Sequence, residues 1–254
     1  MKERVHIHLP FEDLKENIEL IALHRLNVEI LFTGDDLDNY SFETLIEPQK
    51  FLDENGLRVS FHAPFMDLSP GGVDKMVREI TIKRMKQLSE LAEYFKPSVV
   101  VVHPGYDDWR YGEHVDEWLS ESTKTWKMVV DSFMSDETVI AVENIFEKRP
   151  DTLIRLIESV NSPRFRYCMD TGHFNMFSEV SLEEWFEKLG RYIAEIHLHD
   201  NYGVHDEHLG IGEGNFDFPL FFDLLKANGS SPLFTIEGEN KEEVIKSLKF
   251  LKVL

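Results

Sequence analysis

Short runs rich in β-branched and other apolar residues alternate with longer amphipathic stretches along the whole sequence. Each run is followed by apolar residues at helical spacing, as in residues 14–22, 79–95 and 242–251. Strands that alternate with helices pair in parallel, because parallel neighbours need a crossover connection and that connection is usually a helix. Eight such units predict a closed barrel. The eight predicted strands span residues 4–9, 28–32, 58–61, 98–102, 138–142, 166–169, 194–198 and 233–236.

The length of the chain agrees with this fold. Its 254 residues match the roughly 250 of a typical (β/α)8 barrel, and no stretch rich in Pro, Gly or Ser marks a domain boundary. We therefore expect the α/β class, with a single (β/α)8 TIM barrel over residues 1–254. A doubly wound open sheet is the alternative, but the chain has no GxGxxG motif after its first strand and no GxxxxGK[ST] motif.

The charge of the chain limits its partners. Its 27 Lys and Arg against 47 Asp and Glu give a formal net charge of -20. A field of this sign repels polyanions and anionic membrane surfaces, so generic nucleic-acid binding is disfavoured. The single cysteine, Cys168, cannot form an internal disulfide, which favours a reducing compartment. The first ten residues lack an apolar signal segment and no apolar run is long enough to span a bilayer, so we expect a soluble cytoplasmic protein.

Histidines and acidic residues follow the predicted strands. In a barrel of this kind the active site forms at the carboxyl ends of the strands, so these residues are expected at one end of the molecule. Six consecutive strands, the third to the eighth, end in this way. The residues are His62, His103, Glu143, Asp170 with His173, His197, and Glu237, with Asp206 and His208 in the loop after the seventh strand.

One histidine at a strand end is usually only a hydrogen-bonded core residue. Several carboxylates converging on one barrel end, however, would repel one another unless cations neutralised them. Imidazole and carboxylate ligands without thiolate suit a divalent metal ion, Zn, Mn, Co or Fe, with Mg also considered, and one to three ions per chain. His6, His8, His199 and His205 lie at or near the same end, as further contacts to ligands or substrate.

A series of motifs carries a family resemblance over essentially the whole chain. In order they are HAP, HPG, EN, DTGH, HLHD, DEHLGIGEG and IEGE. The sequence resembles the xylose isomerase-like TIM barrel superfamily, which includes endonuclease IV and the sugar phosphate isomerases and epimerases. Seven motifs in register with the predicted strands are specific for the superfamily and much less specific for the reaction.

The resemblance implies two alternative ligand sets. The endonuclease IV pattern implies three metal ions: one on His62, His103 and Glu143, a second on Glu143, Asp170, His197 and Glu237, and a third on His173, Asp206 and His208. The isomerase and epimerase pattern implies one ion on Glu143, Asp170, His197 and Glu237. In that pattern the residues matching Glu143 and Glu237 also move the proton, and the residue matching His173 contacts the substrate.

The loops help to choose between the two reactions. DNA binding needs basic loops, whereas residues 33–38 are acidic, and residues 65–72 add only another acidic residue before Lys75. Aromatic residues just past the strand ends, including Phe65 and Trp109, are candidates for packing on a sugar ring, with ordinary loop packing as the alternative. Arg110, Lys148 and Arg149 are candidates for binding a phosphate or carboxylate, with solvated surface charge as the alternative. Phe146 and Tyr202 are the other aromatic candidates.

We therefore predict a metal-dependent isomerase or epimerase acting on a sugar, sugar phosphate or related polyol. In this reading Glu143 and Glu237 are the catalytic base and acid, the reaction passes through a metal-stabilised enediolate, and His173, Trp109 and Phe65 contact the carbohydrate. The alternative is endonuclease IV-like hydrolysis of a phosphodiester in abasic DNA. A non-catalytic binding protein is a third reading, and the sequence leaves homo-oligomer formation open.

Overall fold

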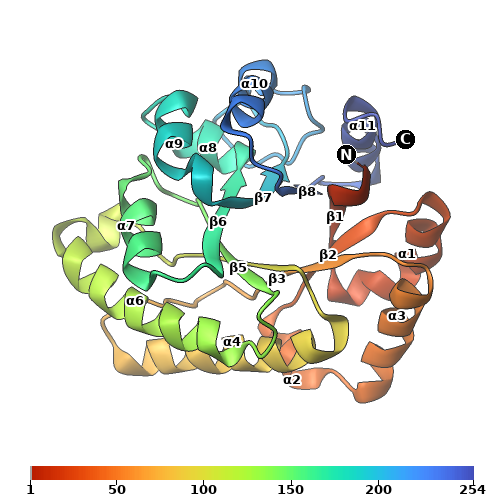
Figure 1. Cartoon of the computed structure of the whole chain (residues 1–254), viewed down its shortest axis with the longest axis horizontal. Coiled ribbons are helices and arrows are strands. Elements are labelled where there is room, and N and C mark those ends of the chain that lie inside the picture. The colour runs from red at the N-terminus through yellow and green to blue at the C-terminus, as the bar shows by residue number, and fades with distance from the viewer. Residues whose placement is uncertain (1) are drawn as a thin grey trace.

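The computed structural model describes residues 2–254, except for the side chains of Lys2, Leu20 and Phe42, and its strands form one closed barrel (Figure 1). Each strand pairs in parallel with the next along the chain, and β8 closes on β1. The predicted (β/α)8 barrel is confirmed. The strands are β1 (Val5–Pro10), β2 (Asn27–Leu31), β3 (Val59–His62), β4 (Val99–Val102), β5 (Val139–Glu143), β6 (Phe165–Asp170), β7 (Ile193–Leu198) and β8 (Leu233–Ile236).

Helices connect the strands and surround the barrel (Figure 1). The α-helices are α1 (Phe11–His24), α2 (Gly34–Asn39), α3 (Phe42–Glu54), α4 (Lys75–Phe95), α5 (Asp108–Tyr111), α6 (Val115–Ser132), α7 (Asp151–Val160), α8 (Thr171–Phe177), α9 (Leu182–Leu189), α10 (Phe218–Asn228) and α11 (Lys241–Phe250). Short 3-10 helices are η1 (Lys2–Arg4), η2 (Gly112–His114) and η3 (Gly190–Tyr192). Within residues 2–254, no helix combines the length and the apolar character needed to cross a bilayer.

The acidic segment 33–38, which we expected to be a loop, forms most of helix α2. Thr33 and Asp36 form a capping box: the Asp36 N–H donates to Thr33 Oγ1 at 3.1 Å, and the Thr33 N–H donates to Asp36 Oδ2 at 2.7 Å. Asp38 accepts two hydrogen bonds from Arg84 of α4, at 2.6 and 2.8 Å. These acidic side chains therefore start a helix and hold it on its neighbour.

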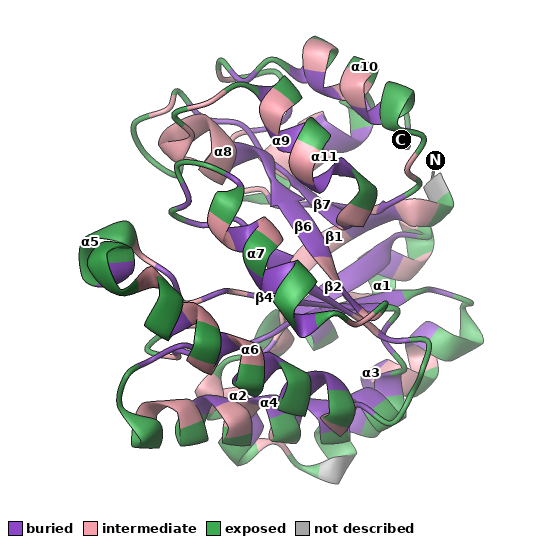
Figure 2. Ribbon diagram, turned by 60° about the vertical axis from the view of Figure 1, so that its left-hand side comes forward, coloured by how far each residue is buried: buried purple, intermediate pink, exposed green. Residues whose placement is uncertain are grey.

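Two apolar regions lie on opposite sides of the sheet. The larger lies between the strands and the helices, where the strands are buried and the helices expose one face (Figure 2). A separate small cluster contains Val99, Val101, Ala141 and Cys168. On β4 these residues alternate with Val100 and Val102 of the larger core, so the small cluster faces the barrel axis. The carboxyl ends of the strands lie beyond this small apolar cluster, where polar side chains can be placed.

Candidate metal centre and active site

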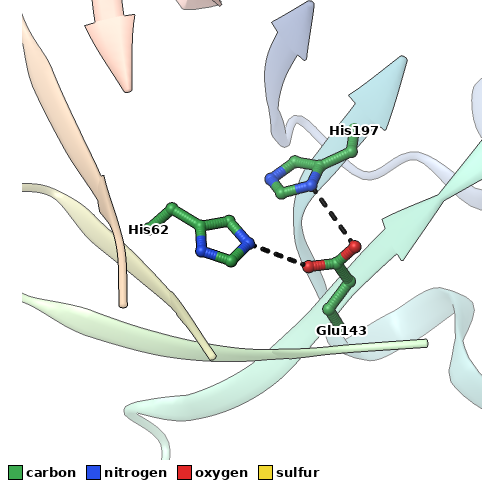
Figure 3. A group of neighbouring side chains, drawn as sticks. All are labelled: His62, Glu143 and His197. Atoms are coloured by element: carbon green, nitrogen blue, oxygen red, sulfur yellow. Dashed lines mark ion pairs between the residues drawn. The ribbon is translucent and has the colours of Figure 1, made fainter. Parts of the chain in front are cut away.

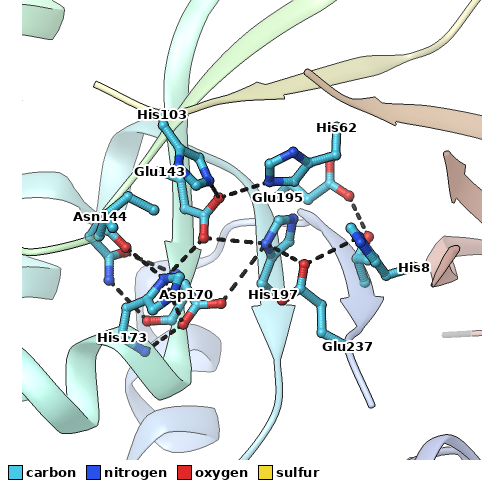
Figure 4. A network of polar contacts seen from close by, with 12 residues as sticks. His8, His62, His103, Glu143, Asn144, Asp170, His173, Glu195, His197 and Glu237 are labelled. Atoms are coloured by element: carbon cyan, nitrogen blue, oxygen red, sulfur yellow. Dashed lines mark hydrogen bonds and ion pairs between the residues drawn. The ribbon is translucent and has the colours of Figure 1, made fainter. Parts of the chain in front are cut away.

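The carboxyl ends of β3 to β8 and the loop after β7 bring the nine predicted metal-binding residues into one network, here called the candidate centre. Figure 4 shows the members that come from the strand ends and from α8. It consists of His62, His103, Glu143, Asp170, His173, His197, Asp206, His208 and Glu237. Seven come from strand ends or from the first turn of α8, and Asp206 and His208 come from the loop after β7. The prediction that these residues lie together is therefore met in the geometry.

Glu143, the last residue of β5, lies in the middle of the candidate centre. Its Oε2 atom is 3.4 Å from Nε2 of both His62 and His103. Its Oε1 atom is 3.1 Å from Nδ1 of His173 and 3.5 Å from Nδ1 of His197. Figure 3 shows Glu143 between His62 and His197, with one oxygen toward each ring. The two carboxylate oxygens thus face two different sets of imidazoles.

Three carboxylates converge on one nitrogen of His197. Its Nδ1 atom lies 3.1 Å from Glu237 Oε1, 3.5 Å from Glu143 Oε1 and 3.9 Å from Asp170 Oδ2. The ring is fully buried, and Nδ1 makes no hydrogen bond. A buried polar atom without a hydrogen bond, surrounded by carboxylate oxygens, is the environment expected of a cation ligand.

The EN motif holds Asp170 in position from the neighbouring strand. Asn144 Nδ2 donates to the Asp170 carbonyl at 3.0 Å, and the Asp170 N–H donates to Asn144 Oδ1 at 2.9 Å. The Asp170 carboxylate also caps α8 by accepting the His173 N–H at 2.6 Å. Asn144 therefore fixes the backbone of Asp170, and the first turn of α8 fixes its carboxylate.

The DTGH motif needs glycine at its third position because of His199. A Cβ atom on Gly172 would lie 2.0 Å from Cε1 of the His199 ring. The absence of a side chain lets that ring place Nε2 3.0 and 3.1 Å from the two oxygens of Asp170. Its Nδ1 atom is buried without a hydrogen bond and lies 3.6 Å from Asp206 Oδ1.

The loop after β7 supplies the outer part of the candidate centre. Asp206 Oδ2 lies 3.4 Å from Nε2 of His173 and 3.1 Å from Nε2 of His208. The His208 ring stacks on His199, with ring centroids 4.1 Å apart. Asp200 anchors this loop by accepting the N–H groups of residues 212, 214 and 216. The HLHD and GIGEG motifs therefore pair with each other to position Asp206 and His208.

Without a metal ion, the carboxylates of the candidate centre raise the pKa values of His173, His197 and His208, whereas burial lowers the pKa of His103. Burial acts to raise the pKa of Glu143, but the His197 and His103 imidazoles outweigh it and hold that pKa well below its usual range. Burial acts to lower the pKa of His208, but Asp206 and Glu237 raise it to about 9. Cations bound here would displace protons from the rings, because a coordinating imidazole must be neutral.

Several groups of three ligand atoms are close enough to share one ion. In each group the atoms lie within 4.8 Å of one another. The groups include His62 with Glu143 and His197, Glu143 with Asp170 and His173, and His199 with His208 and Glu237. The donor chemistry, imidazole nitrogen and carboxylate oxygen, fits a divalent ion.

The predicted substrate contacts differ in their surroundings. Phe65 stacks on His103, with ring centroids 4.3 Å apart, so it forms part of the wall around the candidate centre. His173 is inside the centre, with its side chain 14% exposed. Trp109 is 92% exposed on the short helix α5, which stands at the edge of the molecule (Figure 2).

The basic residues considered as anion contacts have acidic partners in two cases. Lys148 Nζ lies 2.8 Å from Glu179, and Arg149 donates to Glu184 at 2.8 Å. These pairs agree with the solvated-surface interpretation of both residues. Arg110 instead lies over the Tyr111 ring, with its guanidinium carbon 5.9 Å from the ring centroid, near the limit of about 6 Å for a cation–π contact.

Three buried glutamates were missed by the sequence reasoning. Glu29 and Glu195 lie inside the barrel, and both are fully buried. Burial acts to raise the pKa of Glu29, but His197 and His8 hold it well below its usual range. Glu147, in the loop after β5, has its pKa raised to about 7 by burial. An acidic residue in the middle of an apolar strand, as in Val28-Glu29-Ile30, was the signal available for the first two.

Comparisons with known proteins identify the family. A family model described as xylose isomerase-like TIM barrel matches residues 27–254. An uncharacterised protein of Methanocaldococcus jannaschii is 31% identical over 97% of this chain and 86% of that protein. The crystal structure of a D-tagatose 3-epimerase-like protein is 30% identical, with a TM-score of 0.86, covering 98% of this chain and 96% of its own.

A more distant relative carries a different activity in its name. A probable endonuclease 4 of Mycobacterium leprae is 22% identical over 86% of this chain and 88% of that protein. Sugar epimerases and endonuclease IV are thus both among the relatives, as the motifs implied. The chain belongs to the xylose isomerase-like TIM barrel family.

Proposed function

We propose that the protein is a metal-dependent isomerase or epimerase that acts on a sugar, a sugar phosphate or a related polyol. The observation that carries the proposal is the convergence of Glu143, Asp170 and Glu237 on Nδ1 of His197, at 3.5, 3.9 and 3.1 Å. These four residues are the set that would hold one divalent ion. The similarity to the D-tagatose 3-epimerase-like protein supports the same reaction class.

The residues of the candidate centre divide the chemical work. When bound, a divalent ion supplies Lewis acidity that lowers the pKa of a C–H beside a carbonyl and stabilises an enediolate. Glu143 approaches Nδ1 of His197 from β5, and Glu237 approaches the same atom from the end of β8 (Figure 4). One of these carboxylates takes the proton from carbon and the other returns a proton, to the opposite face in an epimerisation.

The surroundings of the candidate centre suit a small polar substrate. The net charge of -20 and the pairing of Lys148 and Arg149 with acidic side chains weaken the attraction for a DNA backbone. Phe65 lines the wall beside His103, and the partly exposed His173 ring lies 3.1 Å from the buried Glu143 carboxylate. We assign substrate contact to His173 and Phe65, and to Trp109 if α5 folds over a bound substrate.

The proposal is tested by proton exchange in heavy water. The metal-loaded protein is incubated with a panel of ketoses and their phosphates, and deuterium at the carbon beside the carbonyl is measured by NMR. Glu143→Gln and Glu237→Gln are each expected to lower the exchange rate by at least about 100-fold, the usual contribution of a general acid or base. Retained exchange in Glu237→Gln would show that the glutamate assignment is wrong.

A matched control is available two residues away. Glu239 is exposed and follows the same strand, so Glu239→Gln is expected to keep the exchange rate. The metal content of every variant is measured by plasma mass spectrometry, because Glu143 and Glu237 are also candidate ligands. A variant that keeps its metal and loses exchange separates proton transfer from metal binding.

A phosphodiester hydrolase is the second candidate, and one feature of Glu143 favours it. Its Oε2 faces His62 and His103 while its Oε1 faces His173 and His197, as expected of a carboxylate that bridges two ions. In that case abasic DNA would be the substrate, and His173, Asp206 and His208 would hold a third ion.

Metal stoichiometry distinguishes the two candidates. About three zinc ions per chain would favour the hydrolase, and the next measurement would be nicking of abasic DNA. About one Mn, Co or Mg ion would favour the isomerase or epimerase. Nicking that is unchanged in the double variant Asp206→Ala with His208→Ala would contradict a three-ion hydrolase.

A further inference from the structure

A buried polar layer lies inside the barrel, below the candidate centre. It contains His6, Glu29, Ser60, Glu195 and Thr235, each fully buried. These residues come from β1, β2, β3, β7 and β8, and they face the barrel axis. A fully apolar interior would satisfy the packing of the barrel, so this layer calls for another explanation.

Glu29 is the member of this layer that contacts the candidate centre. Its Oε2 atom lies 3.3 Å from Nε2 of His197, across the barrel from β2 to β7. Its Oε1 atom lies 2.9 Å from Nδ1 of His8 on the adjacent strand, where His8 is its register partner. Both carboxylate oxygens of Glu29 are therefore occupied by imidazoles.

The contact with His197 places Glu29 at Nε2 and leaves Nδ1 as the nitrogen that faces the other carboxylates. An imidazole whose Nε2–H donates to a carboxylate presents the lone pair of Nδ1 on its other side. In His197 that other side carries Glu143, Asp170 and Glu237, and Nδ1 makes no hydrogen bond. Glu29 thus stands opposite the proposed metal position, with the ring between them.

The contact with His8 extends the influence of Glu29 to a second proposed ligand. Nδ1 of His8 lies 3.3 Å from Glu237 Oε1 as well as 2.9 Å from Glu29 (Figure 4). The His8 ring also packs edge-on against His62, with centroids 5.6 Å apart. Glu29 thereby positions two rings: His8, which contacts Glu237, and His197, which belongs to the candidate centre.

We propose that Glu29 is a positioning residue that orients His197 through Nε2, and Glu237 through His8, and so sets the metal affinity of the candidate centre. This inference rests on the proposed function, because it requires a metal held at Nδ1 of His197. Carboxylates behind a coordinating imidazole fix its orientation and raise its basicity, and their loss usually weakens metal binding 10- to 100-fold.

The layer itself provides a matched control. Glu195 is also fully buried and lies in the same layer, and its Oε1 accepts hydrogen bonds from the hydroxyls of Thr235 and Ser60. Glu29→Gln and Glu195→Gln therefore remove one buried carboxyl group each from neighbouring positions. A Glu195 oxygen also lies within 4.8 Å of ligand atoms of Glu29 and His197. Only Glu29→Gln, however, removes the carboxylate that forms hydrogen bonds with His197 and His8.

The test is a titration of the purified, chelator-treated full chain with Co²⁺, followed by its visible absorption spectrum. Glu29→Gln is expected to weaken Co²⁺ binding about 10- to 100-fold and to shift the ligand-field bands, because the His197 ring is reoriented. Glu195→Gln keeps both imidazole contacts of Glu29, so it is expected to weaken Co²⁺ binding much less than Glu29→Gln does. Circular dichroism of each variant without metal checks that it folds.

Several outcomes would overturn the inference. Glu29→Gln that binds Co²⁺ with unchanged affinity and spectrum contradicts it while leaving the proposed function intact. Equal weakening in Glu29→Gln and Glu195→Gln assigns the effect to the layer in general and also contradicts it. If the unsubstituted protein binds no Co²⁺, the proposed function fails together with the inference.

A second variant covers the case in which Glu29→Gln does not fold. Glu29→Asp keeps the charge but shortens the side chain by one methylene group, so it withdraws from at least one of its two imidazole contacts. Its Co²⁺ affinity is expected to be lower than that of the unsubstituted protein. Unchanged affinity and an unchanged spectrum in folded Glu29→Asp would refute the positioning role.

Discussion

Glu147, in the loop after β5 near the candidate centre, provides a quantitative test of how burial raises the pKa of a carboxyl group. Its side chain is 4% exposed, and Oε2 accepts the Ile145 N–H at 2.7 Å, whereas Oε1 is buried without a hydrogen bond. Burial is the largest influence and raises the pKa of this carboxyl from 4.5 to about 7. The substitution to examine is Glu147→Gln, which has nearly the same shape and stays neutral.

The sign of the effect follows from the raised pKa. Well below pH 4.5 the carboxyl is protonated in both the folded and the unfolded chain, so its pKa difference does not change the free energy of unfolding. As the pH rises, the unfolded chain loses this proton first, and the folded state is progressively destabilised until the pH passes the folded pKa. The pKa values of 4.5 and about 7 correspond to a cost of about 1 kcal/mol at pH 5 and about 3 kcal/mol at pH 8.

The assay is urea denaturation at pH 5 and pH 8 in the presence of a chelator, which keeps metal binding from varying with pH. Glu147→Gln is expected to be more stable than the unsubstituted protein by about 3 kcal/mol at pH 8 and by about 1 kcal/mol at pH 5. Contributions from the histidines are common to both proteins and cancel in the difference. Glu113→Gln, the same substitution at an exposed position of η2, measures the effect of removing a surface charge.

A stability difference that does not change between pH 5 and pH 8 would refute this reasoning. It would mean that the buried Glu147 carboxyl titrates alike in the folded and unfolded chain. A Glu147→Gln protein that is less stable at pH 8 would show that the charged carboxylate is itself stabilised in the fold.

Three further predictions concern packing and metal. Gly172→Ala is expected to lower the free energy of unfolding by about 1–3 kcal/mol, because the new Cβ would displace the His199 ring. Gly112→Ala, whose Cβ would have room, is the control and is expected to be tolerated. Thermal melts compare the two variants. Trp118→Ala is expected to cost about 3–5 kcal/mol in urea denaturation, because Trp118 is fully buried against Tyr106, and a smaller loss would contradict its core role. When the free metal ion is held at 100 times its Kd, its removal by a chelator is expected to lower the free energy of unfolding by about 2.7 kcal/mol. An unchanged melting temperature would argue against a bound ion.

The order of strands and helices followed from local features of the sequence. β-branched runs and helical spacing act over a few neighbouring residues, so all eight strands were predicted close to their observed positions. Strand ends were less exact, since His62, Glu143 and Asp170 are the last residues of β3, β5 and β6 and not the first residues beyond them. Parallel closure then places every strand end at one pole, which is why the candidate centre could be predicted as a group.

Two segments outside the strands depend on contacts that local sequence patterns do not encode. The sequence predicts a loop at 33–38, but the Thr33 and Asp36 cap together with Arg84 stabilises this acidic run as α2. The exposure of Trp109 depends on where α5 stands relative to the barrel, and no spacing in the sequence encodes that.

The sequence by itself determined the fold class, the family motifs and the residues that meet at the barrel end, because these depend on patterns repeated in each βα unit. Only the tertiary structure decided how the rings and carboxylates face one another. Glu29 meets His197 across 168 residues of chain, and Glu143 directs one oxygen to each of two imidazole groups. Such contacts form when the barrel closes, and their geometry depends on side-chain packing from several strands at once.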